Sequence, residues 1–267
     1  MNLNLEKLTY NHVVFENPLI NSDFKNHSHN VYELLFFIKG EASYVIENRK
    51  YGLKKNDLVF IRPNLYHYIE IDSNAEYERI NISFDPTVIK SELIKKIPKE
   101  MEVVNCAQNG VVAEIFGRMN YYATNLNESD FACVLESLLT EIFYALSLST
   151  DEILNIPSEI SPLLTKVLKY ISDNLFTITS VKEISDEFFV TEQYLHRIFQ
   201  TQLKISPKKY LNAKRLLHAQ KLIQRGKKPV DVYVECGFET YVGFYKQYVN
   251  TFGYSPSKEK SKTYLKP

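Results

Sequence analysis

The chain has few cysteines and lacks the segments that secretion or membrane insertion requires. Its three cysteines, Cys106, Cys133 and Cys236, are odd in number and far apart, which argues against a disulfide framework or a cysteine-bound metal cluster. The N-terminus has no basic region followed by an apolar run, and no stretch approaches ~18 uninterrupted apolar residues. We therefore expect a cytoplasmic protein with no membrane partner.

The whole chain also lacks a net charge, but its two parts carry opposite charges. Residues 1–162 carry 14 Lys and Arg against 23 Asp and Glu, a net charge of −9. Residues 163–267 carry 18 against 9, a net charge of +9. Each Lys or Arg near a phosphate releases condensed counterions, so a basic segment favours nucleic acid. A solvated basic face is the alternative interpretation.

The basic part contains one short pattern twice, with an offset of 49 residues. The first copy is Thr191, Leu195, Phe199, Leu203 and Ser206-Pro207, and the second is Thr240, Phe244, Tyr248, Phe252 and Ser255-Pro256. The apolar spacing of four predicts one buried stripe of a helix, the Thr predicts an N-cap, and Ser-Pro predicts the start of another helix. A duplicated helical unit whose opposite face stays outside the core is typical of a tandem helix-turn-helix that enters two stretches of major groove.

The faces opposite the two stripes hold the candidate base contacts. In the first copy they are Glu192, Gln193, His196, Arg197 and Gln200. Arg can bond guanine and Gln can bond adenine in a bidentate manner. In the second copy they are Thr240, Tyr241, Val242, Tyr245, Lys246 and Val249. This face has fewer hydrogen-bonding groups, so we expect weaker sequence discrimination there. For any single residue, a solvated helix face is the alternative.

A connecting helix is expected between the two copies, with Leu216, Ala219 and Leu222 packed between them. A rigid helix there fixes the separation of the two readers near one DNA turn, ~34 Å. The polar side chains of this helix are Lys208, Lys209, Lys214, Arg215 and His218. We expect the lysine pair at the helix start to contact phosphate, and we count Lys208, Lys209 and Arg215 among the DNA-binding residues.

The N-terminal part has a different periodicity. Residues 13–84 form short apolar runs broken by turn residues, which predicts a small antiparallel β barrel or sandwich. From about residue 111 the spacing becomes helical, with a stripe at Leu135, Leu138, Leu139, Ile142, Phe143 and Leu146. Two prolines mark residues 151–162 as a linker. The expected fold class is α+β, with a β-barrel and helical-layer domain over residues 1–150 and an all-α domain over residues 163–267.

Residues 170–261 resemble the DNA-binding domain of the AraC/XylS family of transcriptional regulators. The resemblance is carried by residues 181–199, 206–222 and 235–256, including Gly237-Phe238 and the Gly-x-Ser-Pro ending that starts at Gly253. Two positions depart from the family pattern. Lys204 stands where the first module usually has Gly, and Tyr233 stands where the second usually has a small Ala. We expect a Tyr at a close helix crossing to splay the second module or to force a cavity.

The N-terminal half resembles, more loosely, the cupin sensor domain of the same regulators. The pattern His27-x-His29-x3-Glu33-x6-Gly, followed by His67, is the metal-binding spacing of cupin enzymes. Three imidazoles and a carboxylate suit Fe, Mn, Ni or Zn. The segment of residues 63–67 is shorter than in those enzymes and lacks their Gly. In regulators of this family the same residues are commonly polar groups without metal, so we expect no metal and no other cofactor, with a metal site as the alternative.

A ligand pocket at the mouth of the barrel is the preferred interpretation. Its candidate residues are His27, His29, Glu33, Tyr44, Arg62, His67 and Tyr68. Arg79, Asn81 and Ser83 form a polar strand face that either joins this pocket or faces water outside the barrel. Hydrogen-bonding groups with aromatic walls suit a small polar ligand such as a sugar, and also other metabolites.

The resemblance implies a ligand-responsive transcriptional regulator that binds double-stranded promoter DNA and dimerises through its helical layer. Activation, with RNA polymerase as a partner, is the family-level expectation, and no catalytic residues are needed. One alternative is a metal-dependent cupin enzyme or metal sensor fused to a DNA-binding domain. Another is a constitutive DNA-binding protein whose barrel only assembles the dimer.

Overall fold

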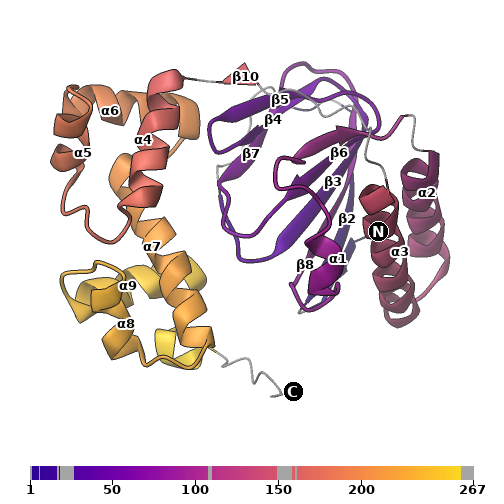
Figure 1. The fold of residues 1–267 in the computed structure, drawn as a ribbon. Coiled ribbons are helices and arrows are strands. Elements are labelled where there is room, and N and C mark those ends of the chain that lie inside the picture. Colours follow the sequence, from indigo (N-terminus) through magenta and orange to yellow (C-terminus); the bar gives the residue numbers. More distant parts are fainter. Residues whose placement is uncertain are drawn as a thin grey trace. The chain divides into compact units, whose positions relative to one another are not determined.

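The fold is α+β, with a sheet-rich N-terminal unit, Met1–Ser158, and a helical C-terminal unit, Glu159–Pro267 (Figure 1). The computed structural model describes residues 2–5, 7–16, 18, 27–107, 110–148, 158–159 and 161–259. Most of the predicted linker, residues 151–162, lies outside the described residues.

The strands form two sheets. The six-stranded sheet has the order β1-β2-β8-β3-β6-β9 and the four-stranded sheet has the order β10-β5-β4-β7. The strands are β1 (Asn2–Asn4), β2 (Leu8–Phe15), β3 (Tyr32–Lys39), β4 (Ala42–Ile46), β5 (Arg49–Gly52), β6 (Asp57–Ile61), β7 (His67–Ile71), β8 (Tyr77–Phe84), β9 (Val103–Asn105) and β10 (Ser158–Glu159). Neighbours among β1 to β9 pair antiparallel, as the short runs and turns predict.

Strand alternation divides the apolar residues of the N-terminal unit between two cores. On β3, Leu35 and Phe37 join the core between the two sheets, whereas Leu34 and Phe36 face the helices. Helices α1 (Ser91–Ile94), α2 (Gly110–Asn125) and α3 (Glu128–Leu148) cover that outer face of the six-stranded sheet (Figure 1). The predicted stripe on α3 is confirmed, because all six of its residues are buried in this core.

Helix α3 is also the one described helix whose length and composition would allow it to cross a bilayer. Its stripe faces aromatic side chains of the sheet, with the rings of Phe143 and Phe60 5.3 Å apart at 77°. Packing of this kind is that of a core helix.

The C-terminal unit consists of short helices grouped around a long one. They are α4 (Pro162–Asp173), α5 (Val181–Glu187), α6 (Glu192–Ile198), a π-helical turn η1 (Phe199–Leu203), α7 (Pro207–Gln224), α8 (Pro229–Glu235), α9 (Tyr241–Phe252) and a 3₁₀ turn η2 (Pro256–Lys258). Leu216, Ala219 and Leu222 of α7 are buried, as predicted for the connecting helix, but the core that they join is the one formed with α8 and α9 of the second module.

The duplicated pattern forms the same local structure twice. Thr191 Oγ1 accepts a hydrogen bond from the backbone N–H of Tyr194, and Thr240 Oγ1 accepts one from Gly243, both at 3.1 Å. The stripe residues of the first copy are fully buried, as are Phe244 and Tyr248 of the second. The predicted caps are therefore confirmed, and so are the stripes except at Phe252, which is half-buried.

Lys204 adopts the backbone conformation of its counterpart Gly253. Their φ angles are 54° and 79°, so the helical segment of each module ends in the left-handed region. A non-glycine residue there costs about 1–2 kcal/mol. The departure from the family pattern thus costs strain but keeps the turn.

Tyr233 lies at the edge of the second module's core. Its ring is half-buried, 5.8 Å from the ring of Tyr241, while its neighbour Val232 is fully buried. Val232, not Tyr233, is the buried residue of α8, and the expected distortion stays a prediction.

Candidate nucleic-acid interface and effector site

Both helix-turn-helix modules close their turns with the same hydrogen bonds. Val190 N–H donates to Ser185 O and Phe238 N–H donates to Tyr233 O, both at 3.0 Å, across a residue of positive φ. This residue is Phe189 in the first module (53°) and Gly237 in the second (75°). The bonds are those of a Schellman motif, which ends one helix and sets the direction of the next.

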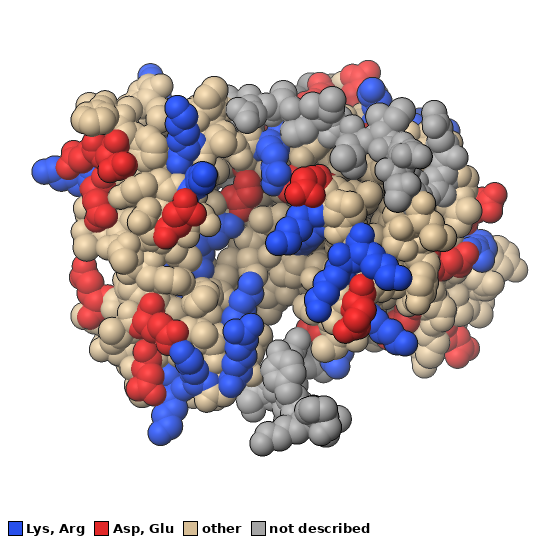
Figure 2. Space-filling view, viewed as in Figure 1, with Lys and Arg blue, Asp and Glu red and all other residues tan. Residues whose placement is uncertain are grey.

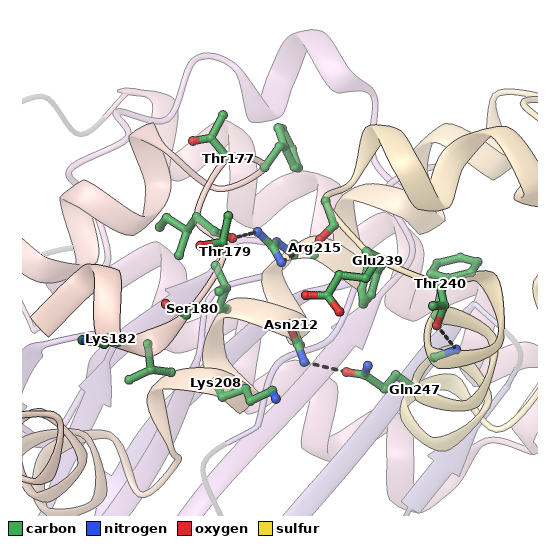
Figure 3. A pocket seen from close by; sticks show the side chains of 18 of the residues that line it. Thr177, Thr179, Ser180, Lys182, Lys208, Asn212, Arg215, Glu239, Thr240 and Gln247 are labelled. Atoms are coloured by element: carbon green, nitrogen blue, oxygen red, sulfur yellow. Dashed lines mark hydrogen bonds between the residues drawn. The ribbon is translucent and has the colours of Figure 1, made fainter.

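Helix α7 fastens the two modules to each other. Arg215 Nε donates to Leu175 O (2.8 Å) and its terminal nitrogens donate to Ile178 O (2.6 Å) and Gly237 O (2.9 Å). One turn earlier, Asn212 Nδ2 donates to Gln247 Oε1 of α9 at 2.7 Å (Figure 3). The first module's loop and the second module's turn are thus held on one helix.

Arg215 is therefore not available as the DNA contact that the sequence suggested. The side chain is buried, with 6% exposure, and all three guanidinium nitrogens donate to backbone carbonyls. Burial lowers the pKa of Arg215 from its usual value, although the group remains a cation. Its structural role is to join the modules.

A hollow of about 700 Å³ lies between the modules (Figure 3). Its polar lining includes Lys182, Glu192 and His196 of the first module, Lys208 and Asn212 of α7, and Gln247 of α9. The Asn212 and Gln247 pair was not identified from the sequence. The signal for it was weak, since one polar residue on each helix is ordinary.

The predicted base contacts of the first module lie at the surface. Glu192, Gln193, His196, Arg197 and Gln200 are all exposed, and so are Lys208 and Lys209. The Arg197 guanidinium carbon is 5.0 Å from the centroid of the Tyr194 ring, an arrangement that supports the long side chain.

The second module offers a more apolar face. Tyr245 and Lys246 are exposed, and Val242 is 63% exposed. Thr240 is exposed but its oxygen caps α9, and Tyr241 is half-buried against Tyr233. Figure 2 shows Lys and Arg interspersed with Asp and Glu over the helical unit on the face drawn, so the net basic charge is not one uniform patch there.

A polar cluster lies at one end of the space between the two sheets. His27 and His67 form an antiparallel bridge, with N–H to O distances of 3.2 and 2.9 Å, which places their rings on the same side. Their ring centroids are 4.4 Å apart, and that of His29 lies 4.8 Å from that of His67. His67 is fully buried, whereas His27 is exposed, so the cluster has a solvent-facing edge.

Glu33 is the acidic member of this cluster. Its Oε2 lies 2.8 Å from His29 Nε2 and 3.6 Å from His67 Nε2. Burial on its own raises the pKa of Glu33, but the hydrogen bond with His29 and the charge interactions with His29 and His67 outweigh it and hold the pKa well below its usual range. Glu33 is therefore a carboxylate.

The other carboxylate oxygen of Glu33, Oε1, accepts two further hydrogen bonds. Tyr44 donates its hydroxyl to it at 3.3 Å, and the Asn81 amide, in the orientation that satisfies its neighbours, donates at 3.0 Å. Asn81 and its neighbours Arg79 and Ser83 are half-buried and alternate with Ile80 and Ile82, which belong to the helix-side core. The polar face of β8 thus lies between the sheets, not on the outside of the barrel.

Two predicted pocket residues lie elsewhere. Arg62 stacks over Phe60 on the helix side of the six-stranded sheet and donates to the carbonyls of residues 97, 98, 99 and 101, with Met101 O at 3.1 Å. Tyr68 follows His67 on β7 and therefore points to the opposite face of that strand. The structure brings together His27, His29, Glu33, His67 and Tyr44, and leaves Arg62 and Tyr68 out.

Comparison with known proteins matches both units to described families. Residues 9–127 match the AraC-like ligand binding domain, and residues 184–262 match a helix-turn-helix domain. Together these two matches span most of the chain.

Among curated proteins, the Msm operon regulatory protein of Streptococcus mutans is 24% identical over 235 residues, covering 85% of this chain and 83% of its own. The HTH-type transcriptional activator RhaS of Escherichia coli is 23% identical over 255 residues, covering 91% of this chain and 90% of its own.

Among solved structures, an apo ToxT variant from Vibrio cholerae aligns at 14% identity with a TM-score of 0.43, covering 96% of this chain and 97% of that chain. The two domain matches and the two curated regulators, together with the tandem helix-turn-helix geometry, establish a DNA-binding transcriptional regulator. The chain belongs to the AraC/XylS family of transcriptional regulators.

Proposed function

We propose that the chain is a cytoplasmic transcriptional activator that acts as a homodimer and responds to a small polar metabolite, with no catalytic reaction of its own. Residues 1–150 would sense the effector and dimerise, residues 151–162 would link the two parts, and residues 163–267 would bind DNA. The observation that carries this proposal is the pair of equivalent modules fastened to α7 by Arg215 and by the Asn212–Gln247 bond.

A fixed pair of modules suits a straight duplex. With α6 and α9 in successive major grooves, the phosphate backbone between them would pass over the hollow lined by Lys182 and Lys208. Arg197 and Gln193 would read bases, whereas Tyr245 and Lys246 would contribute thymine-methyl contact and phosphate anchoring. The half-site of the second module would therefore tolerate more sequence variation.

The sensor assignment is supported by the polar end of the inter-sheet space. Glu33, His67 and Asn81 present hydrogen-bonding groups beside the Tyr44 ring, which stacks on His67 at 6.1 Å and 11°. A sugar has hydroxyls that need such partners and ring faces that pack on aromatics, so it is the class of effector that we favour.

Dimerisation through the helical layer is supported by apolar side chains on the outer faces of α2 and α3. Tyr121, Tyr144 and Leu148 are 65%, 51% and 80% exposed. Contact between two copies of this face would remove them from water. Activation is supported by the name of the relative RhaS, an HTH-type transcriptional activator, and would make RNA polymerase a further partner.

DNA selection in vitro with the full chain tests the proposal. Fluorescence anisotropy then measures the affinity of the wild type, Arg197→Ala and Arg225→Ala for the selected operator and for a scrambled duplex. Arg225→Ala is the control, because Arg225 is an exposed Arg at the C-terminal cap of α7. We expect Arg197→Ala to lose about 1–3 kcal/mol on the operator and little on the scrambled duplex. Equal losses on both duplexes would argue against base reading by α6.

A thermal-shift screen of the full chain against sugars, other metabolites and divalent metals tests the sensor. A ligand at 100 times its Kd adds about 2.7 kcal/mol of stability. A hit that also changes operator affinity supports an effector-responsive regulator, whereas full operator affinity with no responsive ligand would favour a barrel that only assembles the dimer.

A further inference from the structure

The imidazole rings of the polar cluster are oriented by backbone carbonyls. His29 Nδ1 lies 3.0 Å from Val31 O, and His67 Nδ1 lies 2.9 Å from Leu65 O. A carbonyl oxygen can only accept, so each Nδ1 must carry the hydrogen. In the neutral rings, the Nε2 atoms are therefore the ones with lone pairs.

Both Nε2 atoms face Glu33 Oε2, at 2.8 and 3.6 Å. A carboxylate oxygen is also an acceptor, so three electron-pair donors converge with no hydrogen between them when the rings are neutral. His67 Nε2 is in addition buried and has no hydrogen-bond partner among the described residues. Such an arrangement is costly unless a cation, either a proton on one imidazole or a metal ion, lies among the three atoms.

His27 completes a set of four donors. One ligand atom from each of His27, His29, Glu33 and His67 lies within 4.8 Å of all the others. Ligands at 2.0–2.1 Å from a tetrahedral ion are about 3.3 Å apart, so small inward movements of the side chains suffice. The exposed His27 provides an entry path from solvent.

The surroundings are those of a metal ligand set. The ring N–H groups of His29 and His67 bond carbonyls, and Tyr44 and Asn81 hold the outer oxygen of Glu33, so the ligands are oriented by a second layer of hydrogen bonds. Three imidazoles and one carboxylate favour Zn, Ni, Co, Fe or Mn over Ca and Mg, which prefer oxygen ligands.

We propose that His27, His29, Glu33 and His67 bind one divalent first-row transition-metal ion in the sheet domain. The ion would join the segment at His27 to β3 and β7, and would thereby stabilise the polar end of the inter-sheet space. This inference does not depend on DNA binding, since it concerns only atoms of the sheet domain, and it shares Glu33 and His67 with the proposed effector site.

The test uses the full chain without a histidine tag and without chelator. Metal content is measured by mass spectrometry, and Zn²⁺, Ni²⁺ and Co²⁺ are titrated by calorimetry and thermal shift. We expect one equivalent per chain and a rise in Tm. Glu33→Gln should bind no metal but still fold, because its amide can donate to an imidazole lone pair. His27→Ala changes an exposed residue and should weaken binding by at least about tenfold.

His12→Ala is the matched control, since His12 is on β2 outside the cluster and bonds Glu78 at 2.8 Å. It should bind metal like the wild type. The proposal is overturned if the wild type takes up well under one equivalent and shows no metal-dependent Tm shift. It is equally overturned if Glu33→Gln and His27→Ala retain the binding of the His12→Ala control.

Discussion

Replacing Arg215 by Met is expected to loosen the two helix-turn-helix modules from each other. The change keeps an apolar stem but removes three hydrogen bonds of 2.6 to 2.9 Å to the carbonyls of Leu175, Ile178 and Gly237. Bonds to a charged group contribute about 1.5–3 kcal/mol each. Dehydrating the guanidinium offsets part of their sum, so we expect a net loss of about 3 kcal/mol. Arg215→Lys keeps the charge and one bond, and should lose about 2 kcal/mol.

Hydrogen exchange of the full chain, followed by mass spectrometry, measures this loss locally. A loss of about 3 kcal/mol corresponds to about 100-fold faster exchange of amides in α7 and α8. Amides of α3 serve as an internal reference, because they belong to the other unit. Lys221→Met is the control, as it makes a similar side-chain change at an exposed position of α7. Unchanged exchange in α7 and α8 of Arg215→Met would refute the structural role assigned to this residue.

DNA binding should report the same change. Two rigidly joined modules bind their half-sites with a high effective concentration, which a loosened pair loses. We therefore expect Arg215→Lys to weaken binding to the complete operator by about tenfold more than to a duplex with one half-site. Equal weakening on both duplexes would indicate a direct phosphate contact, as the sequence suggested, and would contradict the burial of Arg215.

Three further predictions each test the surroundings of a single residue. Lys204→Gly should raise the stability of the helical unit by about 1 kcal/mol, because φ is 54° there; hydrogen exchange measures this, and a destabilised variant would contradict it. Lys246→Ala should lower the salt dependence of operator binding by about one phosphate contact without changing base preference, and an altered preference on reselection would argue against that role. Burial, and then the Glu235 charge, raises the pKa of the Cys236 thiol to about 12, so iodoacetamide should label the exposed Cys133 well before Cys236; equal rates would show that the native core opens readily.

Local features of the fold could be predicted from the sequence because local chemistry determines them. A Thr followed by apolar residues at a spacing of four leaves one cap and one buried stripe as the favourable arrangement, and both copies have it. The change from strand to helix periodicity near residue 111 likewise reflects which side chains can reach a common face.

Long-range contacts could not be predicted in this way. Arg215 was taken as surface-exposed because basic residues on a helix usually are, yet its acceptors include the carbonyl of Leu175, 40 residues earlier in the chain. Arg62 behaves similarly, since its acceptors lie 35 to 39 residues later. The prediction that Tyr68 lines the pocket was wrong for a different reason. Strand alternation already assigns it to the face opposite His67, so this placement could have been avoided.

Phe189 and Gly237 close the turns of the two modules with the same left-handed backbone conformation, but their surroundings differ. Phe189 is 97% exposed, so its left-handed conformation costs strain without a steric conflict. A side chain at Gly237 would place Cβ 2.7 Å from Phe176 O and 3.0 Å from the Arg215 guanidinium. The second turn therefore needs Gly because α7 and the loop before α5 close against it, and the first turn accepts Phe because it faces solvent. The duplication kept the turn in both modules, whereas the glycine is required only where Arg215 joins them.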